Sequence, residues 1–377
     1  MARVVHFGKF FPPHHGGIES VTRTLAVGAA AAGHDVTVVC FSRRSGLWQE
    51  IVAGVRVLRS LAPTSLGSQP LSFLYCIHCL RLGRRADIVH LHAPNVLASI
   101  CALLIPSKTR LLVHWHSDIL KKGIVYKFFR PIEFLLLRRA DCIVATSRAY
   151  ADASKPLKGF KKKIVCVPIG VANRVCDSLT EFLDAKFTAL IGQKRILLAV
   201  GRLVAYKGFD ILIEAARFLP DDTVVLIVGE GAMRPELQLA IVEHGVTDRV
   251  LLTGGVNSAT LYHFFERATL FCLPSTYRAE AFGVVLLEAM SFGLPIVATD
   301  IPGSGVPWVN QNNKTGFNVR PGDAQAFAEA CNKILKSDPL RHLFSRNARE
   351  RFRSKFSEEK SVETFMHIYE RFASVQN

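Results

Sequence analysis

Two glutamates eight residues apart, Glu280 and Glu288, flank the otherwise apolar segment AEAFGVVLLEAM (residues 279–290). Because glutamate is seldom fully buried without a partner, each needs a cation or hydrogen-bond donors. Glu280, at a predicted helix entrance, could simply cap the helix. Glu288 lies in a run that is apolar nearly all round, where ligand hydroxyl groups would serve as donors. Eight helical residues rise about 12 Å, close to the reach between the two sugars of a nucleotide diphosphate sugar.

Two cations stand close together on a glycine-bounded loop. The segment GRLVAYKG (residues 201–208) follows a strand-like run and carries Arg202 and Lys207. Ligands of open parallel sheets bind beyond the carboxyl ends of the strands, where this loop is expected to lie. Arginine can fork two oxygen atoms and lysine supplies a point charge, so the pair suits a diphosphate. The plainer alternative is two solvated loop charges.

A second candidate anion site lies near the amino terminus. The segment FFPPHHGGIESV (residues 10–21) places Gly16 and Gly17 directly before a predicted helix. Adjacent glycines let backbone N–H groups approach a ligand, and the helix N-terminus favours negative charge. A tight turn would use the same residues, and the spacing is not that of a dinucleotide-binding fingerprint.

Histidines alternate along two further strand-like runs. In RLLVHWHSDI (residues 110–119), His114 and His116 lie on the same side of a predicted strand. We interpret His114 as a core histidine and His116, followed by polar Ser117 and Asp118, as facing the ligand crevice. The HLH segment at residues 90–92 makes a weaker case of the same kind.

The elements around these residues predict an α/β fold of two doubly wound domains. Short Val- and Ile-rich runs separated by helical segments are typical of parallel sheets covered on both faces. The first half contains RVVHFGKF, DVTVVCF, ADIVHLHA, RLLVHWHS, DCIVATS and KIVCVPIGV, with a helix expected over residues 18–32. The second half contains RILLAVGRL, TVVLIVGEG, RVLLTGGV, TLFCLPS, PIVATD and GFNV.

The same pattern sets the expected boundaries. We expect a first domain over residues 1–171, a linker over 172–193 and a second domain over 194–357. Residues 358–377 have helical apolar spacing but follow the last strand pattern, so from the residues alone they could pack on either domain.

Composition indicates a globular protein of two or three domains. Of 377 residues, 49% are hydrophobic and 21% charged. No secretory signal is predicted, and the uncharged apolar runs fall short of the roughly 20 residues that span a bilayer. Nine cysteines scattered through apolar segments favour reduced thiols and a cytoplasmic protein. The CIHC run at residues 76–79 lacks a second pair of zinc ligands, which favours a helix face.

The net charge of +16 is confined to the first half. Residues 1–170 hold 24 Lys and Arg against 8 Asp and Glu, whereas residues 171–377 hold 23 of each. A solvated basic face is the plain interpretation. An excess this one-sided favours an anionic partner, such as nucleic acid, acidic lipid or a phosphorylated acceptor.

Taken in order, these motifs resemble a known family. Gly16–Gly17, HWHSD around His116, GRLVAYKG and EAFGVVLLE are similar to the motifs of the retaining nucleotide-sugar glycosyltransferases of family 4. Those enzymes have the GT-B fold, two Rossmann-like domains facing across a cleft. The resemblance covers nearly the whole chain, and it implies that residues 358–377 pack back toward the first domain.

The resemblance also implies roles for the charged residues. Arg202 and Lys207 would bind the donor diphosphate. Glu280 would contact the transferred sugar and stabilise the oxocarbenium-like state, and Glu288 would hold the ribose hydroxyls. Ala281 stands where the family commonly has proline, a departure that leaves both carboxylates in place.

Other positions carry over in the same way. His116 would lie near the reacting centre as the second catalytic residue. Further donor contacts would come from Gly17, Phe282 and Gly283. Weaker acceptor-side candidates are Gly16, Ser117 and Asp118.

The implied chemistry is transfer with retention of the anomeric configuration. The nucleoside diphosphate would depart and the acceptor would attack on the same face, without a covalent nucleophile. No Asp-x-Asp motif or histidine-carboxylate cluster stands beside these elements, so we predict no metal and no cofactor, with Arg202, Lys207 and backbone N–H groups neutralising the diphosphate. LPSTYRAEAFG and DIPGSGVPWVNQNNKTGFNVRPGD are similar to segments of bacterial polysaccharide transferases, which implies GDP-mannose or GDP-rhamnose as donor.

A basic and apolar surface is expected in the first domain. KKGIVYKFFRPIEFLLLRR (residues 121–139) and KPLKGFKKK (residues 155–163) are similar to segments that rest on anionic lipid. Pro131 is expected to break or start a helix there. Acceptors in the family are often saccharides linked to polyprenyl diphosphate, so we expect peripheral binding at the cytoplasmic face of the inner membrane.

Three alternatives remain at this point. A sugar-nucleotide epimerase would need no acceptor, and a phosphorylase would favour orthophosphate. A nucleic-acid-binding protein would show steep salt-dependent affinity, but the cations alternate with large aliphatic residues and no recognition motif is present.

Overall fold

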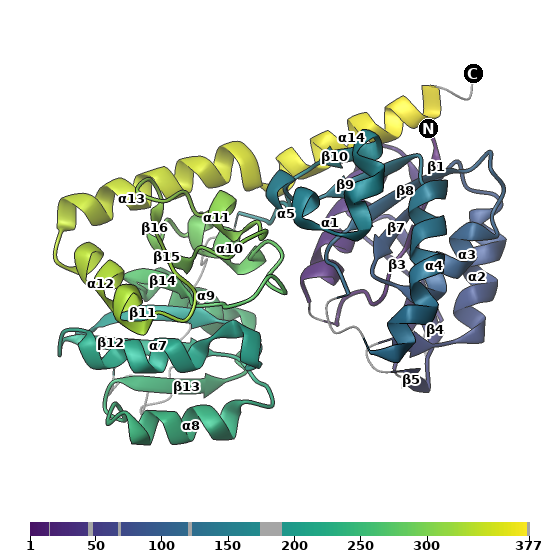
Figure 1. Cartoon of the computed structure of the whole chain (residues 1–377). Helices are drawn as coiled ribbons and strands as arrows, with labels where there is room; N and C mark the ends of the chain where they lie inside the picture. The colour runs from purple at the N-terminus through teal and green to yellow at the C-terminus, as the bar shows by residue number, and fades with distance from the viewer. Residues whose placement is uncertain (15, 44–47, 67–68, 120–122, 174–190, 375–377) are drawn as a thin grey trace. The chain divides into compact units, whose positions relative to one another are not determined.

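The computed structural model describes residues 1–14, 16–43, 48–66, 69–119, 123–173 and 191–374. Contacts divide the chain into two units, Met1–Val171 with Glu358–Asn377, and Ala172–Ser357 (Figure 1). Most of the expected linker, residues 172–193, lies outside the described residues. Each unit is built on its own mainly parallel sheet, so the predicted pair of doubly wound α/β units is confirmed.

The first unit contains an eight-stranded sheet in the order β10-β9-β8-β7-β1-β2-β4-β3. The strand order reverses between β1 and β7, which makes the carboxyl ends of these two strands a topological switch point. Its strands are β1 (Arg3–Phe7), β2 (Asp35–Ser42), β3 (Gln49–Val52), β4 (Val55–Leu61), β7 (Ile88–Ala93), β8 (Arg110–Trp115), β9 (Cys142–Ala145) and β10 (Ile164–Cys166). Its helices are α1 (Gly17–Ala31), α2 (Phe73–Gly83), α3 (Val96–Leu103), α4 (Ile124–Arg139), α5 (Arg148–Ala153) and the 3-10 segment η1 (Pro156–Lys163).

The edge of this sheet was not predicted from the sequence. β3 is antiparallel to β4, and the two-residue connection of Ala53 and Gly54 has positive φ at both positions. Positive φ at both central residues is typical of tight hairpin turns. The alternation of apolar and polar residues in VRVLRSL could have predicted the strand β4. The short strands β5 (Thr64–Leu66) and β6 (Gln69–Leu71) form a separate two-stranded sheet.

The second unit contains a six-stranded, fully parallel sheet in the order β13-β12-β11-β14-β15-β16. Its order reverses between β11 and β14, which places a second switch point there. The strands are β11 (Arg195–Val200), β12 (Thr223–Val228), β13 (Val250–Gly254), β14 (Leu270–Leu273), β15 (Ile296–Thr299) and β16 (Gly316–Val319). The helical segments are η2 (Ala205–Lys207), α7 (Phe209–Ala215), η3 (Ala216–Phe218), α8 (Arg234–Glu243), α9 (Ser258–Arg267), α10 (Val284–Ser291), α11 (Val306–Val309), α12 (Ala324–Leu335), α13 (Asp338–Arg351) and η4 (Phe352–Phe356).

The last helix, α14 (Glu358–Ser374), belongs to the first unit although it follows the second in sequence. It packs on α1, and the Val362 side chain fills the space above Gly28. Figure 1 draws α14 in yellow at the C-terminal end of the chain. A Cβ atom at Gly28 would lie 2.5 Å from that side chain, so the close approach needs glycine. The Ser361 hydroxyl donates to the Pro168 carbonyl at 3.3 Å.

α4 runs through Pro131, so the expectation that Pro131 breaks or starts a helix is wrong. Proline removes the hydrogen bond to the carbonyl four residues earlier, which here is that of Lys127. Lys127 and Pro131 are both exposed, so water can hydrate that carbonyl. None of the described helices is both long enough and apolar enough to cross a bilayer.

Candidate functional site

Two loops meet at the switch point of the second unit. The loop after β14 donates the Thr276 N–H to the Tyr206 carbonyl of the loop after β11, at 2.8 Å. Gly208 has φ +66°, and a Cβ atom there would lie 2.2 Å from the Pro274 carbonyl oxygen. Both the backbone conformation and the close approach therefore require glycine. This packing brings Lys207 and Glu280, which are 73 residues apart, to the same place.

Lys207 and Glu280 form a buried ion pair. Lys207 Nζ lies 2.6 Å from Glu280 Oε2, and the two side chains are only 10% and 11% exposed. The Ser275 hydroxyl donates to the same carboxylate oxygen at 3.1 Å, and the Ser304 hydroxyl donates to the main-chain carbonyl of Glu280. Glu280 is therefore partnered by a lysine and a serine of its own unit. The expectation that it acts only as a helix cap does not describe this contact.

Glu288 occupies a different environment. α10 begins at Val284, and Gly283 at φ +77° forms its N-cap. Glu280 lies in the preceding turn, so the separation of the two carboxylates is not set by eight helical residues, and the expected 12 Å rise does not apply. Glu288 is half-buried rather than fully buried.

Two further donor-side candidates, Arg202 and Phe282, lie on these two loops. Arg202 is exposed on the loop after β11. Phe282 is buried and its ring packs near those of Trp308 and Phe356, with centroids 6.1 and 6.2 Å away. Phe282 thus anchors the turn that leads into α10.

In the first unit, Gly17 is the first residue of α1 and Gly16 is its N-cap. Both are exposed, and the Glu19 carboxylate folds back against Gly16, where an added Cβ would lie 2.1 Å from its Oε2. A carboxylate is stabilised at a helix N-terminus. The Glu19 carboxylate therefore lies beside the helix terminus at which phosphate binding was expected, and that binding stays a prediction.

The loop after β8 contains Ser117, which is half-buried, and Asp118. Asp118 is buried and accepts hydrogen bonds from Trp115 Nε1 at 2.9 Å and from the Ser154 hydroxyl at 2.6 Å. Its side chain fixes the loop that follows His116.

His116 is 6% exposed, and its Nε2 lies 3.0 Å from His92 Nδ1. Burial lowers the pKa of His116 to about 3, so its imidazole is neutral at pH 7. His114 is 1% exposed. Both histidines are therefore buried, and the expectation that His116 faces an open crevice while His114 lies in the core is wrong. His6 and Tyr369, which also hydrogen-bond within this group of buried histidines, were not identified from the sequence.

Potential metal ligands converge in only one part of the described structure. The groups of three or more ligand atoms within 4.8 Å of one another are His6–His90–His92 and His92–His114–His116, both in the first unit. Within the described residues, no such group lies beside Lys207 or Glu280. The CIHC run is part of α2.

Comparisons with known proteins cover both units. A family model of group 1 glycosyl transferases matches residues 182–351, and a model of a glycosyl transferase 4-like domain matches residues 16–170. The O-antigen chain mannosyltransferase C of Escherichia coli is 30% identical, with 97% of this chain and 98% of that protein aligned. The D-rhamnosyltransferase WbpZ of Pseudomonas aeruginosa is 28% identical, with 94% and 92% aligned.

Solved structures share the fold at lower identity. A sucrose-phosphate synthase from Thermosynechococcus elongatus superposes with a TM-score of 0.78 at 20% identity, covering all of both chains. HepE of Anabaena, solved with UDP, gives a TM-score of 0.78 at 20% identity over 98% of this chain and all of that one. WaaG, a glycosyltransferase of lipopolysaccharide biosynthesis, gives 0.68 at 19% identity over 96% and 99%.

The buried ion pair predicts non-additive effects on stability. We expect Lys207→Met to lower the free energy of unfolding by about 3–5 kcal/mol, because it leaves the Glu280 carboxylate buried without its cation. The double variant Lys207→Met/Glu280→Gln should lose less than the sum of the two single variants. Urea denaturation of the three variants measures this coupling.

The matched control is the exposed pair of Arg148 and Asp152, whose side chains are 65% and 48% exposed. Arg148→Met should change stability little, since exposed pairs contribute little. Additive losses at Lys207 and Glu280 would show that the pair is not coupled.

Proposed function

The chain belongs to the GT-B glycosyltransferases, and we propose that it transfers mannose or rhamnose from a GDP-sugar to a saccharide acceptor in surface-polysaccharide assembly. Glycosyltransferase family membership, expected from the sequence, is confirmed by the two family models and by the relative that is 30% identical over 97% of this chain. The names of two full-length relatives, a mannosyltransferase and a rhamnosyltransferase, favour the donor class.

The observation that carries the proposal is the Lys207–Glu280 pair at the switch point of the second unit. A nucleotide diphosphate bound there would compete with Glu280 for the ammonium group of Lys207. Arg202, exposed on the same loop, supplies a second cation. Backbone N–H groups at the start of α10 add a positive dipole. These groups neutralise the departing diphosphate without a divalent metal.

Glu280 then acts on the transferred sugar. Once the diphosphate engages Lys207, the Glu280 carboxylate stabilises positive charge that develops at the anomeric carbon. The Ser275 and Ser304 hydroxyls hold the side chain and the backbone of Glu280 in place. Departure of the leaving group and attack of the acceptor occur on the same face, so the anomeric configuration is retained. Glu288, half-buried on α10, binds the ribose hydroxyls.

An exposed surface of apolar and basic side chains in the first unit supports the proposal of a lipid-linked acceptor. On α4, Phe128 is 76% exposed, Phe134 54% and Leu135 46%, and Phe128 and Leu135 are seven residues apart on one helix face. The Phe160 ring of η1 lies 5.6 Å from that of Phe134. Exposed cations on the two elements are Lys127, Arg130, Arg138, Lys158, Lys161 and Lys162.

The neighbouring helices extend this apolar surface. α3 packs against both α2 and α4. The large exposed apolar side chains here are Phe73 and Ile77 of α2, Ile100 of α3 and Leu104, the residue that follows α3. Apolar side chains interleaved with cations suit the interface of an anionic membrane. We therefore place the enzyme peripherally on the cytoplasmic face of the inner membrane, acting on a saccharide linked to polyprenyl diphosphate.

Thermal unfolding with nucleotide sugars tests the donor. A donor present at about 100 times its dissociation constant should stabilise the protein by roughly 2.7 kcal/mol. We expect GDP-mannose or GDP-rhamnose to raise Tm more than UDP-glucose, and we expect EDTA to leave that shift unchanged. A larger shift with UDP-glucose would contradict the donor assignment, and loss of the shift with EDTA would contradict metal independence.

Separate roles for the two glutamates predict separate kinetic defects. Glu280→Gln should lower kcat by roughly a hundredfold, because it removes a charge acting on the transition state, while nucleotide affinity should not fall, because Lys207 stays available to the diphosphate. Glu288→Ala should chiefly raise the KM for the donor. Initial rates with a radiolabelled donor measure both effects. The opposite pattern would reverse the assigned roles.

Membrane binding predicts sensitivity to an exposed aromatic residue. Phe128→Glu should weaken sedimentation with phosphatidylglycerol vesicles at low salt by roughly tenfold or more, because it removes a large apolar group from the interface. Leu239→Glu is the matched control, since Leu239 is 64% exposed on α8 of the other unit. Equal loss in both variants, or no binding by the unmodified protein, would exclude this surface.

A further inference from the structure

Five histidines gather on one face of the sheet in the first unit. β1 carries His6, β7 carries His90 and His92, β8 carries His114, and His116 follows β8. Strand register pairs His6 with His90 and His92 with His114, and the two-residue alternation puts all five side chains on the same face. All five are buried. The cluster lies at the switch point between β1 and β7.

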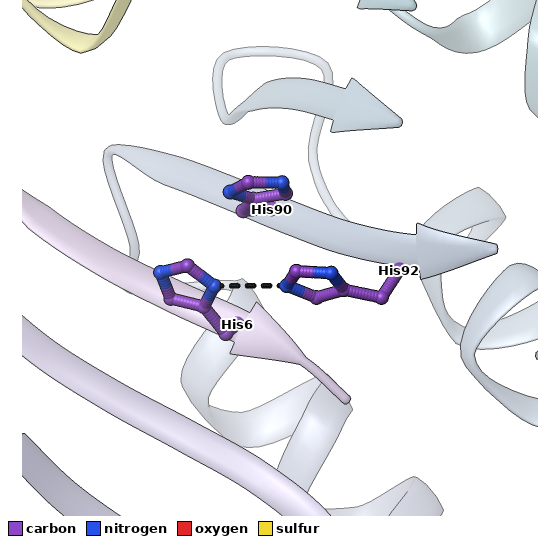
Figure 2. A group of neighbouring side chains, drawn as sticks. All are labelled: His6, His90 and His92. Atoms are coloured by element: carbon purple, nitrogen blue, oxygen red, sulfur yellow. Dashed lines mark hydrogen bonds between the residues drawn. The ribbon is translucent and has the colours of Figure 1, made fainter. Parts of the chain in front are cut away.

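Hydrogen bonds order these rings into two rows. The first row contains His6, His92 and His116, with N–N distances of 3.1 Å from His6 Nδ1 to His92 Nε2 and 3.0 Å from His92 Nδ1 to His116 Nε2. The second row joins His90 Nε2 to His114 Nδ1 at 3.3 Å. Figure 2 shows the His6 and His92 rings joined end to end by the dashed bond, with His90 beside them.

A tyrosine of α14 connects the two rows. The Tyr369 hydroxyl lies 2.6 Å from His90 Nδ1 and 3.5 Å from His6 Nε2. Phe365, one turn earlier on α14, stacks its ring near those of His90 and His114, with centroids 5.3 and 5.2 Å away. The C-terminal helix therefore both covers the histidine face and completes its hydrogen bonding.

The geometry is that of a hydrogen-bonded chain rather than a metal centre. Along the first row, ring centroids are 5.4 and 5.3 Å apart and the ring planes differ by only 20° and 12°. The two nitrogens of each bond thus lie on the line between neighbouring ring centres, so that the N–H of one ring points at the lone pair of the next. Metal ligands instead converge on one point about 2.0–2.1 Å from each nitrogen. Among the described residues no carboxylate bonds to these rings, and a buried dication would lack compensating charge.

One unpartnered atom indicates which nitrogen donates and which accepts in each of these hydrogen bonds. A neutral imidazole has one N–H donor and one acceptor nitrogen. His114 Nε2 is buried with no hydrogen-bond partner among the described residues. Among backbone groups a buried N–H without a partner is rarer than a carbonyl oxygen without one, and we apply the same preference to this ring. We therefore assign the proton of His114 to Nδ1, from which it is donated to His90 Nε2.

The remaining protons follow from this choice. His90 uses Nδ1–H toward the Tyr369 oxygen, and Tyr369 donates its hydroxyl proton to His6 Nε2. His6 and His92 then each donate from Nδ1 to the next ring. His116 accepts at Nε2 and keeps its own proton on Nδ1.

We propose that His92, His6 and Tyr369 are positioning residues that hold His116 as its Nδ1–H tautomer, so that its remaining nitrogen is a hydrogen-bond donor to substrate oxygen. The part of the proposal that concerns substrate rests on the proposed function. Burial lowers the pKa of all five rings, which keeps them neutral and preserves the single chain of donors and acceptors. A glycosyl donor or acceptor rich in hydroxyl and phosphate oxygens needs such a donor with a fixed orientation.

Nitrogen NMR of the full-length protein labelled with ring-15N histidine tests the tautomer without substrate. In the unmodified protein at pH 7, His116 should show a protonated Nδ1 and an unprotonated Nε2. In His92→Phe, which keeps an aromatic ring but removes both nitrogens, His116 should become a mixture of tautomers. Its kcat should fall roughly three- to tenfold, the usual value of one neutral hydrogen bond, with the donor KM unchanged. Tyr369→Phe preserves side-chain shape and should also loosen the tautomer.

Phe365→Leu is the matched control, because it alters packing on the same rings without touching a hydrogen bond. An Nε2–H tautomer of His116 in the unmodified protein would overturn the proposal. The same is true if the His92→Phe and Tyr369→Phe spectra leave His116 unchanged, if Phe365→Leu shifts it equally, or if the purified protein binds stoichiometric zinc. Because the spectra need no sugar nucleotide, failure of the donor assignment would appear separately, as inactivity with GDP-sugars.

Discussion

The ion pair between Lys207 and Glu280 constrains the whole loop region of the second unit. Each side chain is about one-tenth exposed, and a charge at that depth is costly unless its partner stays within contact distance. The loops after β11 and β14 must therefore keep one relative position. Gly208 makes this possible by approaching the Pro274 carbonyl more closely than any other residue could, and the bond between Thr276 and Tyr206 fixes the register of the two loops.

In the first unit, too, buried polar side chains need partners, but here the partners carry no charge. At its switch point the polar groups are imidazoles, which burial keeps neutral and which serve one another as donor and acceptor. A charge pair suits a site that must bind and release an anion, because the ligand can replace one partner. A neutral chain suits a site that must present one oriented N–H group. The two sheets thus place different chemistry at the equivalent position of their topology.

The sequence predicted the strands that carry these sites because their Val- and Ile-rich runs are short, continuous and separated by helical segments. It also predicted which loops hold the chemistry, since loops at strand ends are the general location of ligands. It did not predict that Lys207 would pair with Glu280, because contact over 73 residues depends on the order of β11 and β14 in the sheet. The separation of Glu280 and Glu288 was misjudged because Gly283 starts α10 only after Glu280. His6 and Tyr369 left no local signal, since their contact exists only when α14 covers β1 and β7.

The packing of α14 over this face links the C-terminal helix to the protonation state of the histidine rings. Burial in the folded unit lowers the pKa of His6 and His116 to about 3, while in an unfolded chain histidine titrates near 6.5. Between these values the unfolded state binds more protons than the folded state, so the stability contributed by this face is complete above about pH 6.5 and falls as the pH decreases toward 3. Phe365 and Tyr369 therefore do more than fill space. They exclude the water that would protonate the rings, and a charged ring would break the single donor–acceptor order on which the orientation of His116 depends.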